Sequence, residues 1–284
     1  AAWSWGGDTT LRALAAEYGV ETFPQPRVGD AVYDDAEGGA GRRFPDDGAA
    51  GPGAVRFRGG LQTLAEKLAE EVSSSISLKT KVTEIKVLNL LEGVSTRTED
   101  GAEYRSKAVA VALPPRIASQ VTYVPRLPER KLNAMAATRT WMGEAMKVAL
   151  RFEEPWWRDH GYSGSVMSNQ GPLAQIWDNS DDQEGLYALA GFAFGEVADS
   201  LDAVSDDRLI TLLGRQLARS LRVKKVPPPT EVSRLYWSRE PLTHLEPLPG
   251  HDDVRNYGNP KLRATHERAV FFAGTETDPE HGHV

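Results

Sequence analysis

The fold of this chain is limited above all by short strand-like runs that are not separated by regularly spaced helices. Residues 145–152 read AMKVALRF, in which apolar side chains recur at every second position, as in a strand with one buried face. Similar runs predict strands at Val82–Leu88, Val94–Thr98, Ala108–Ala112, Ser165–Met167, Ala174–Trp177, Leu186–Phe192 and Val232–Trp237. Because strands and helices do not alternate regularly, we predict an α+β fold with a mixed, largely antiparallel sheet and flanking helices.

Helical spacing of apolar residues predicts the flanking helices. Asp206–Leu221 carries the clearest pattern, and a helix is also predicted over Asp8–Tyr18, with Asp8 as its N-cap and Gly19 as its stop. Two more begin near Leu61 and Pro128. Residues 29–53 are rich in Gly, Pro and Asp instead, a composition typical of a loop or linker.

Composition excludes several classes of function. The 284 residues have a net charge of −7, which is unlike the basic surface of a nucleic-acid-binding protein. No cysteine is present, so disulfides and thiolate metal sites are ruled out. Apart from the pair His281 and His283 in a loop, the histidines lack the spacing of a metal site, and no apolar run is long enough to span a membrane. We therefore expect no metal, nucleic acid or membrane partner, and a cytoplasmic protein.

The segment Val270–Val284 points to a ligand. A short apolar run is followed by Gly274, Thr275 and Glu276, which place a permissive backbone and a hydroxyl beside free N–H groups. Strand-to-glycine turns are common, so the chemistry alone leaves a purely structural turn open. The string FAGTET, however, closely resembles the segment that closes over FAD in flavin-containing amine oxidases of the monoamine and polyamine oxidase type.

Other segments resemble the same family in the same order. They are AAWSWGG at the start, FRGGLQ at 57–62, KVTEI at 81–85, ALPP at 112–115 and MGEAMK at 142–147 followed by FEEPWW at 152–157. The resemblance implies flavin-dependent oxidation of a small amine, in which a hydride passes to FAD and oxygen reoxidises the flavin to give hydrogen peroxide. A desaturase or protoporphyrinogen-type oxidase, or a non-catalytic module that binds a ligand or a partner, remains an alternative.

The family resemblance also implies roles for individual residues. From the strand alone, Lys147 is either a lysine that points to solvent or a charge held among apolar neighbours. The resemblance implies the second, with Lys147 holding a water beside the flavin N5. Contacts with FAD are implied for Gly59, Gly60, Val82, Trp237, Gly274, Thr275, Glu276 and Val284, and contacts with the substrate for His283 and Trp3.

The sequence departs from the family pattern in two respects. The helical stretch that family members place between the Tyr33 region and Arg58 is reduced to a Gly-Pro linker. The opening strand and its GxGxxG turn, which hold the pyrophosphate at a helix N-terminus, are not found. We therefore expect a truncated member that would bind FAD non-covalently in the parent enzyme but lacks it in this chain alone. The expected regions are residues 1–60, a remnant of the FAD-binding region with a Gly/Pro-rich linker, residues 61–240, the substrate-binding domain, and residues 241–284, a return segment.

Overall fold

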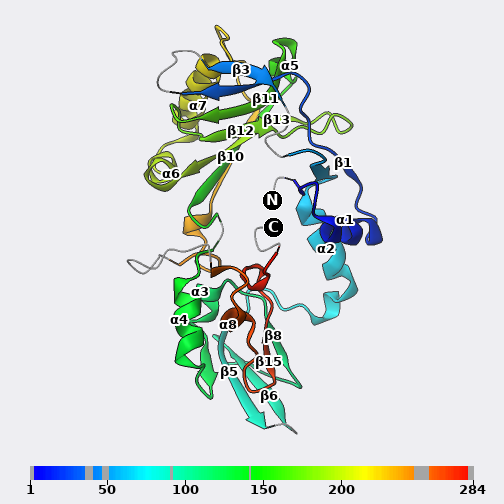
Figure 1. Cartoon of the computed structure of the whole chain (residues 1–284), viewed down its shortest axis with the longest axis vertical. Helices are drawn as coiled ribbons and strands as arrows, with labels where there is room; N and C mark the ends of the chain where they lie inside the picture. Colours follow the sequence, from blue (N-terminus) through cyan, green and yellow to red (C-terminus); the bar gives the residue numbers. More distant parts are fainter. Residues whose placement is uncertain are drawn as a thin grey trace. The chain divides into compact units, whose positions relative to one another are not determined.

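A computed structural model describes residues 3–35, 41–46, 51–89, 92–140, 142–245 and 256–280. The chain forms two compact units, each built from segments that are distant in sequence (Figure 1). The first contains residues 1–73 and 144–236, and the second contains residues 74–143 and 237–284. The predicted range 61–240 is divided between the two units, so its role as one substrate-binding domain stays a prediction.

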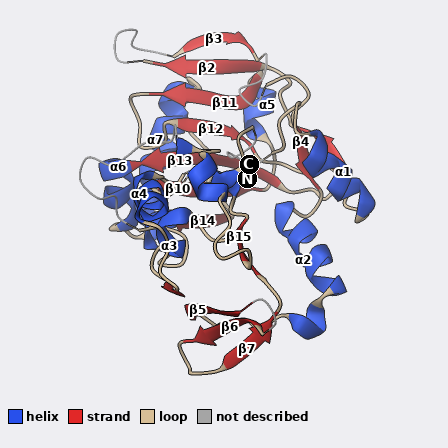
Figure 2. Cartoon of the chain, turned by 60° about the horizontal axis from the view of Figure 1, so that its bottom comes forward, coloured by secondary structure: helices blue, strands red, loops and turns tan. Residues whose placement is uncertain are grey.

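A seven-stranded sheet is the framework of the first unit (Figure 2). Every neighbouring pair in it is antiparallel except β11 and β2, which are parallel. Mixed sheets with flanking helices were predicted, and this fold class is confirmed. The strands, in spatial order, are β14 (Glu231–Tyr236), β10 (Ala145–Phe152), β13 (Tyr187–Phe194), β12 (Gln175–Asp178), β11 (Tyr162–Ser168), β2 (Asp30–Asp34) and β3 (Arg42–Pro45).

One face of this sheet is packed into the main core of the unit. In β10, Met146, Val148, Leu150 and Phe152 are buried, and they join the apolar side of α7 (Asp206–Ser220). Ser205 caps α7 by accepting a hydrogen bond from the Arg208 N–H. The short helices α5 (Trp156–Asp159) and α6 (Gly195–Asp202) complete this layer. The alternation of β10 therefore directs Lys147 to the other face of the sheet.

The N-terminal residues of the first unit form a smaller cluster. Helices α1 (Thr9–Glu17) and α2 (Leu61–Glu71) pack with Phe57 of β4 (Val55–Phe57), which pairs with β1 (Thr22–Pro24). Gly19 follows α1 with a φ of 67°, as its role as a helix stop requires. Asp8 is the N-cap residue, but its carboxylate accepts from the Trp5 N–H, at 2.7 Å, rather than from the helix.

The second unit contains two further sheets. Their strands are β7 (Glu103–Ser106), β6 (Gly93–Thr98), β5 (Val82–Asn89) and β9 (Thr122–Val124) in one, and β15 (Val270–Phe272) with β8 (Val109–Val111) in the other. Its helical segments are η1 (Ser73–Ser75), which begins at the boundary, α3 (Pro115–Ala118), α4 (Glu129–Ala137), η2 (Trp237–Arg239), α8 (Pro260–Arg263) and η4 (Thr275–Thr277).

One prediction about the chain's organisation was wrong. Residues 29–53 were interpreted as loop or linker, but they contain β2 and β3. Strand β2 buries Ala31 and Val32 and pairs with both β11 and β3. Long-range pairing thus overrides the local composition, because hydrogen bonds to β11 stabilise a strand whose own sequence is too short and polar to indicate one.

Candidate active site

The open face of the seven-stranded sheet holds Lys147 among aromatic side chains. Lys147 is half-buried and lies directly opposite Phe192 in the neighbouring strand β13. Its ammonium nitrogen is 5.8 Å from the centroid of the Trp177 ring, which is also 4.7 Å from the Phe192 ring. The strand alternation predicted for residues 145–152 thus places the lysine on an aromatic surface and not in open solvent.

Two positive charges lie close together at this face. Burial lowers the pKa of the Lys147 ammonium, and the positive charge of Arg56 on β4 lowers it further. The pKa of Arg56 is itself lowered by burial, against the opposing effects of Asp178 and Asp181. An ammonium with a lowered pKa releases a proton more readily than an ordinary lysine, which suits a group that exchanges protons with water.

Trp3 belongs to the same aromatic surface. Its ring is nearly perpendicular to that of Trp177, with centroids 5.2 Å apart, and it meets Trp5 in the same manner at 5.7 Å. The structure therefore brings Trp3 and Lys147 onto one aromatic wall, with Trp177 between them. Trp177 was not singled out from the sequence, although its place in a predicted strand was a usable signal.

Gly59 and Gly60 line a pocket of about 370 Å³ on this side of the first unit. Both have a positive φ, of 71° and 87°, and Gly60 is the N-cap of α2 without a side chain to cap the helix. A Cβ on Gly60 would meet no atom within 4 Å. The uncapped start of α2 therefore presents backbone N–H groups beside open space. Such N–H groups are favourable donors to an anionic group.

The Gly274–Glu276 segment lies in the second unit. Strand β15 pairs in parallel with β8, and a Cβ on Gly274 would be 2.7 Å from the Leu113 carbonyl oxygen, so only glycine fits. Thr275 begins the turn η4, in which Glu276 is buried and its pKa is raised by that burial. The Gly258 N–H donates to the Glu276 carbonyl at 2.9 Å. The structure thus holds these three residues in one tight turn.

The other predicted contact residues are placed separately. Val82 opens β5, pairs with Thr98 of β6, and is half-buried. Trp237 opens η2 directly after β14 and is also half-buried. His283 and Val284 lie outside the described residues. The predicted contact residues are therefore distributed over both units, and Lys147 and Trp3 share one unit with Gly59 and Gly60.

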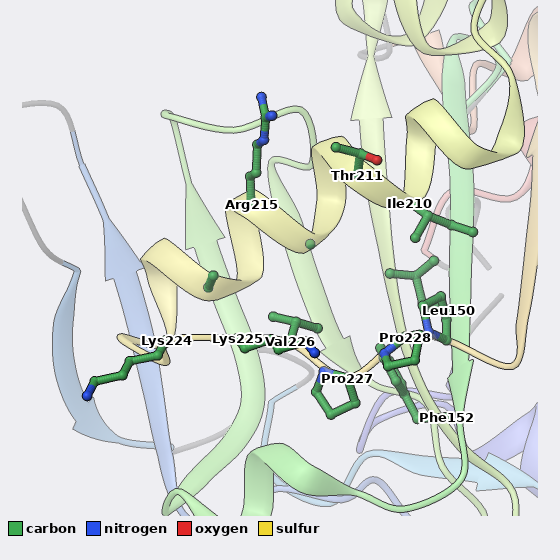
Figure 3. A pocket seen from close by; sticks show the side chains of 13 residues that line it. Leu150, Phe152, Ile210, Thr211, Arg215, Lys224, Lys225, Val226, Pro227 and Pro228 are labelled. Atoms are coloured by element: carbon green, nitrogen blue, oxygen red, sulfur yellow. The ribbon is translucent and has the colours of Figure 1, made fainter.

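A second pocket of the first unit is separate from this site. Its volume is about 280 Å³. Figure 3 shows Ile210 of α7 above Leu150, with Pro228 next to Leu150 and Phe152. Leu150 and Phe152 belong to the core face of β10, so this pocket lies across the sheet from Lys147. Arg215 and Lys224 extend away from it in Figure 3.

Known proteins share this architecture. A cyclohexylamine oxidase from Brevibacterium oxydans superposes with a TM-score of 0.82 at 18% sequence identity, over 99% of this chain and 82% of its own. A putrescine oxidase bound to putrescine gives a TM-score of 0.80 at 18% identity, over 99% and 83%. At this identity the likeness establishes the fold. In addition, the sequence profile of the flavin containing amine oxidoreductases matches residues 28–284.

The chain belongs to the flavin-containing amine oxidoreductase family.

Curated members of the family match over part of their length. A probable flavin-containing monoamine oxidase A of Dictyostelium discoideum is 31% identical over 50% of this chain and 31% of its own length. An L-amino acid dehydrogenase of Synechocystis is 31% identical over 51% and 30%, and human amine oxidase B is 25% identical over 78% and 42%. The chain thus spans about a third to two fifths of the length of these relatives.

Two negative observations complete the description of this amine oxidoreductase chain. Within the described ranges, no helix is both long and apolar enough to cross a membrane. In the same part of the chain, no three His, Asp or Glu side chains come together as a metal site would require. The candidate site features are therefore the aromatic wall of Trp177 and Phe192, Lys147, and the uncapped start of α2 at Gly60.

Proposed function

We propose that this chain forms the substrate-binding part, and some of the flavin-facing part, of an FAD-dependent amine oxidase. The observation that carries the proposal is the half-buried Lys147 on an aromatic wall formed by Trp177 and Phe192. The names of the family members support it, since relatives and structural neighbours are described as amine oxidases. A small amine is accordingly the proposed substrate.

The described residues fit an FAD group at two places. The uncapped start of α2, with open space at Gly60, suits a phosphate or a carbonyl-rich ring. The turn from Gly274 to Glu276 offers a backbone without a Cβ and the Thr275 hydroxyl. When bound, FAD supplies a two-electron acceptor for a hydride from the carbon beside the amine, and passes the electrons on to oxygen. This chain contains no cysteine that could form a thioether to FAD, so we propose that FAD binds non-covalently. A chain without cysteines also fits a reducing compartment, so the proposed location is the cytoplasm.

Lys147 and the aromatic residues would have different roles, the first toward the flavin and the second toward the amine. The Lys147 ammonium donates hydrogen bonds, so it would hold a water and favour negative charge that develops beside it. The faces of Trp177 and Phe192 attract a positively charged amine and exclude bulk water. Trp237, Val82 and Val284 are proposed contacts of the cofactor, and His283 and Trp3 of the substrate. We further propose that this chain alone retains no FAD during purification.

The purified protein should be titrated with FAD and then mixed with an amine in the absence of oxygen. The proposal predicts that the visible absorbance of the flavin bleaches on addition of amine. It also predicts that the absorbance returns, with hydrogen peroxide, on addition of air. The longest available form of the protein should be used, with a chain carrying Lys147→Met as control. Flavin that binds stoichiometrically but is never bleached by any of a panel of amines would refute the proposed activity.

A further inference from the structure

The pocket between α7 and residues 224–229 has no part in the proposed reaction. Leu150 and Phe152, which line it, belong to the core face of β10, across the sheet from Lys147. The volume of this pocket, the α7 groove, is about 280 Å³ and lies below the roughly 300–1,000 Å³ that is usual for a small-molecule site. The α7 groove therefore has room for one large side chain of a partner rather than for a whole small-molecule ligand.

Gly214 keeps the α7 groove open on the helix side. It lines the groove together with Ile210 and Ala218, which are one helical turn before and after it. A Cβ on Gly214 would meet no atom within 4 Å. Because this position has no side chain and no described residue fills the space, an apolar group from outside can approach the backbone of α7 closely.

The rim of the α7 groove is basic, although the protein as a whole is acidic. Residues 208–230 contain six Lys and Arg residues and no Asp or Glu, whereas the whole chain has a net charge of −7. Arg215, Lys224 and Lys225 line the groove, and all three are exposed. Within the described part of the chain, none of the three forms an ion pair, and no acidic residue lines the groove. The groove thus presents positive charge that the fold itself does not neutralise.

The wall of the α7 groove opposite the helix offers unused backbone acceptors. Val226 is followed by three prolines, 227–229, which favour an extended backbone and carry no N–H. No described residue donates a hydrogen bond to the carbonyl groups of residues 224–229. The N–H groups of an extended peptide can therefore donate to this wall, as they do in other grooves that bind peptides.

We propose that the α7 groove binds an acidic peptide segment of a partner protein, which inserts one large apolar side chain beside Gly214. Carboxylates on both sides of the inserted residue pair with Arg215, Lys224 and Lys225. In Figure 3 the Arg215 and Lys224 side chains extend away from the groove, so a chain that continues beyond the groove reaches them and a small ligand inside it does not. This site is independent of the proposed amine oxidation.

An anionic membrane fits the same surface less well. A protein that lies on a membrane inserts protruding apolar side chains between the lipids. The apolar residues Leu150 and Phe152 are instead each 3% exposed and lie inside the groove. The concave shape favours a partner that brings its own apolar side chain.

Selection from a library of random dodecapeptides tests the docking site with the full chain. The selected sequences should share one large apolar residue with Asp or Glu on both sides of it. A fluorescein-labelled peptide of that consensus then gives the Kd by fluorescence anisotropy, and its binding should weaken as the salt concentration rises. Selection of peptides without acidic residues, or of none at all, would overturn the proposal.

Two variants separate the apolar contact from the charges. Gly214→Leu should abolish peptide binding because its side chain occupies the groove, and it should not destabilise α7, since leucine has the higher helix propensity. Loss of binding without a lower Tm is therefore due to the filled groove. Joint replacement of Arg215, Lys224 and Lys225 by Ala should weaken binding roughly tenfold, because three exposed ion pairs are lost together.

Arg208→Ala is the matched control. Arg208 is an exposed arginine of the same helix that does not line the groove, so its replacement should leave the Kd unchanged. Binding that survives Gly214→Leu, or that falls as much with Arg208→Ala as with the triple replacement, would overturn the assignment to the α7 groove. Displacement of the peptide by vesicles containing phosphatidylserine would identify a membrane site instead. Self-association that the peptide disperses would identify a second copy of the chain as the occupant, and either result would overturn the proposed peptide partner.

Discussion

Lys147 is a single ionisable residue whose surroundings oppose its charge. It is half-buried, its pKa is lowered by burial and by Arg56, and its ammonium nitrogen lies 5.8 Å from the centroid of the Trp177 ring. Lys147→Met in the FAD-loaded enzyme should slow the reaction of reduced flavin with oxygen by about 10²-fold, the usual effect of losing one electrostatic donor. Substrate affinity should change much less, since the methionine stem preserves the packing. Stopped-flow mixing with oxygen measures this, and an unchanged rate would identify Lys147 as an ordinary strand lysine.

Lys147 and Trp3 could be singled out from the sequence as candidate site residues, whereas Arg56 could not. Lys147 interrupts an apolar run whose period reveals which way it points, and Trp3 belongs to a segment that resembles the family. Arg56 lies in a three-residue strand, β4, too short to show any period. Its charge lowers the pKa of Lys147, and this interaction exists only after residues far apart in the chain come together. Such electrostatic interactions between distant residues are a property of the folded structure and not of local sequence.

Among the helices, α7 combines a strong apolar side with a glycine at a point where glycine is not required. A Cβ on Gly214 would meet nothing within 4 Å, and its φ is not positive, so alanine fits. Gly214→Ala should raise the free energy of unfolding by about 1 kcal/mol, the difference in helix propensity. Gly171→Ala is the contrasting control, because its Cβ would overlap Gln216, whose amide is bonded to both the N–H and the carbonyl of Leu173. Gly171→Ala should lower the free energy of unfolding by roughly 1–3 kcal/mol. Urea denaturation measures the free energy of unfolding of both variants. Equal destabilisation by the two substitutions would contradict the prediction.

At the scale of elements, the sequence predicted β10 and α7 well but not β2 and β3. The first two are long and carry a complete apolar period, whereas β2 and β3 have five and four residues, and β3 has every side chain exposed. Both are held by backbone pairing: β2 pairs with β11, and β3 pairs with β2. Such strands form because a partner strand is present. For β2 one partner, β11, lies more than a hundred positions away and leaves no trace in the local pattern.

In the molecule as a whole, each unit has its own apolar core. In the second unit, the charged residue Lys131 is buried. Its ammonium donates to the carbonyls of Lys261, Leu262 and Ala264, at 3.0, 2.7 and 2.8 Å. Burial lowers the pKa of Lys131 to about 8 from 10.5. Between these values the unfolded chain binds more protons than the folded chain, so the free energy of unfolding should rise with pH through this window. Chemical denaturation at several pH values tests this, and Lys131→Met should remove the rise; an identical pH profile in both proteins would exclude Lys131 as its source.

The division of the first unit into residues 1–73 and 144–236 has a consequence for synthesis on the ribosome. Strand β2 emerges early, but its parallel partner β11 follows only after the whole 74–143 segment has been made. Strand β14, at the opposite edge of the sheet, is completed later still, at Tyr236. Closing such distant pairs costs chain entropy before the contacts form, which slows folding. The edge of β2 that faces β11 therefore stays unpaired during synthesis until residues 162–168 have been made, although its other edge can already pair with β3.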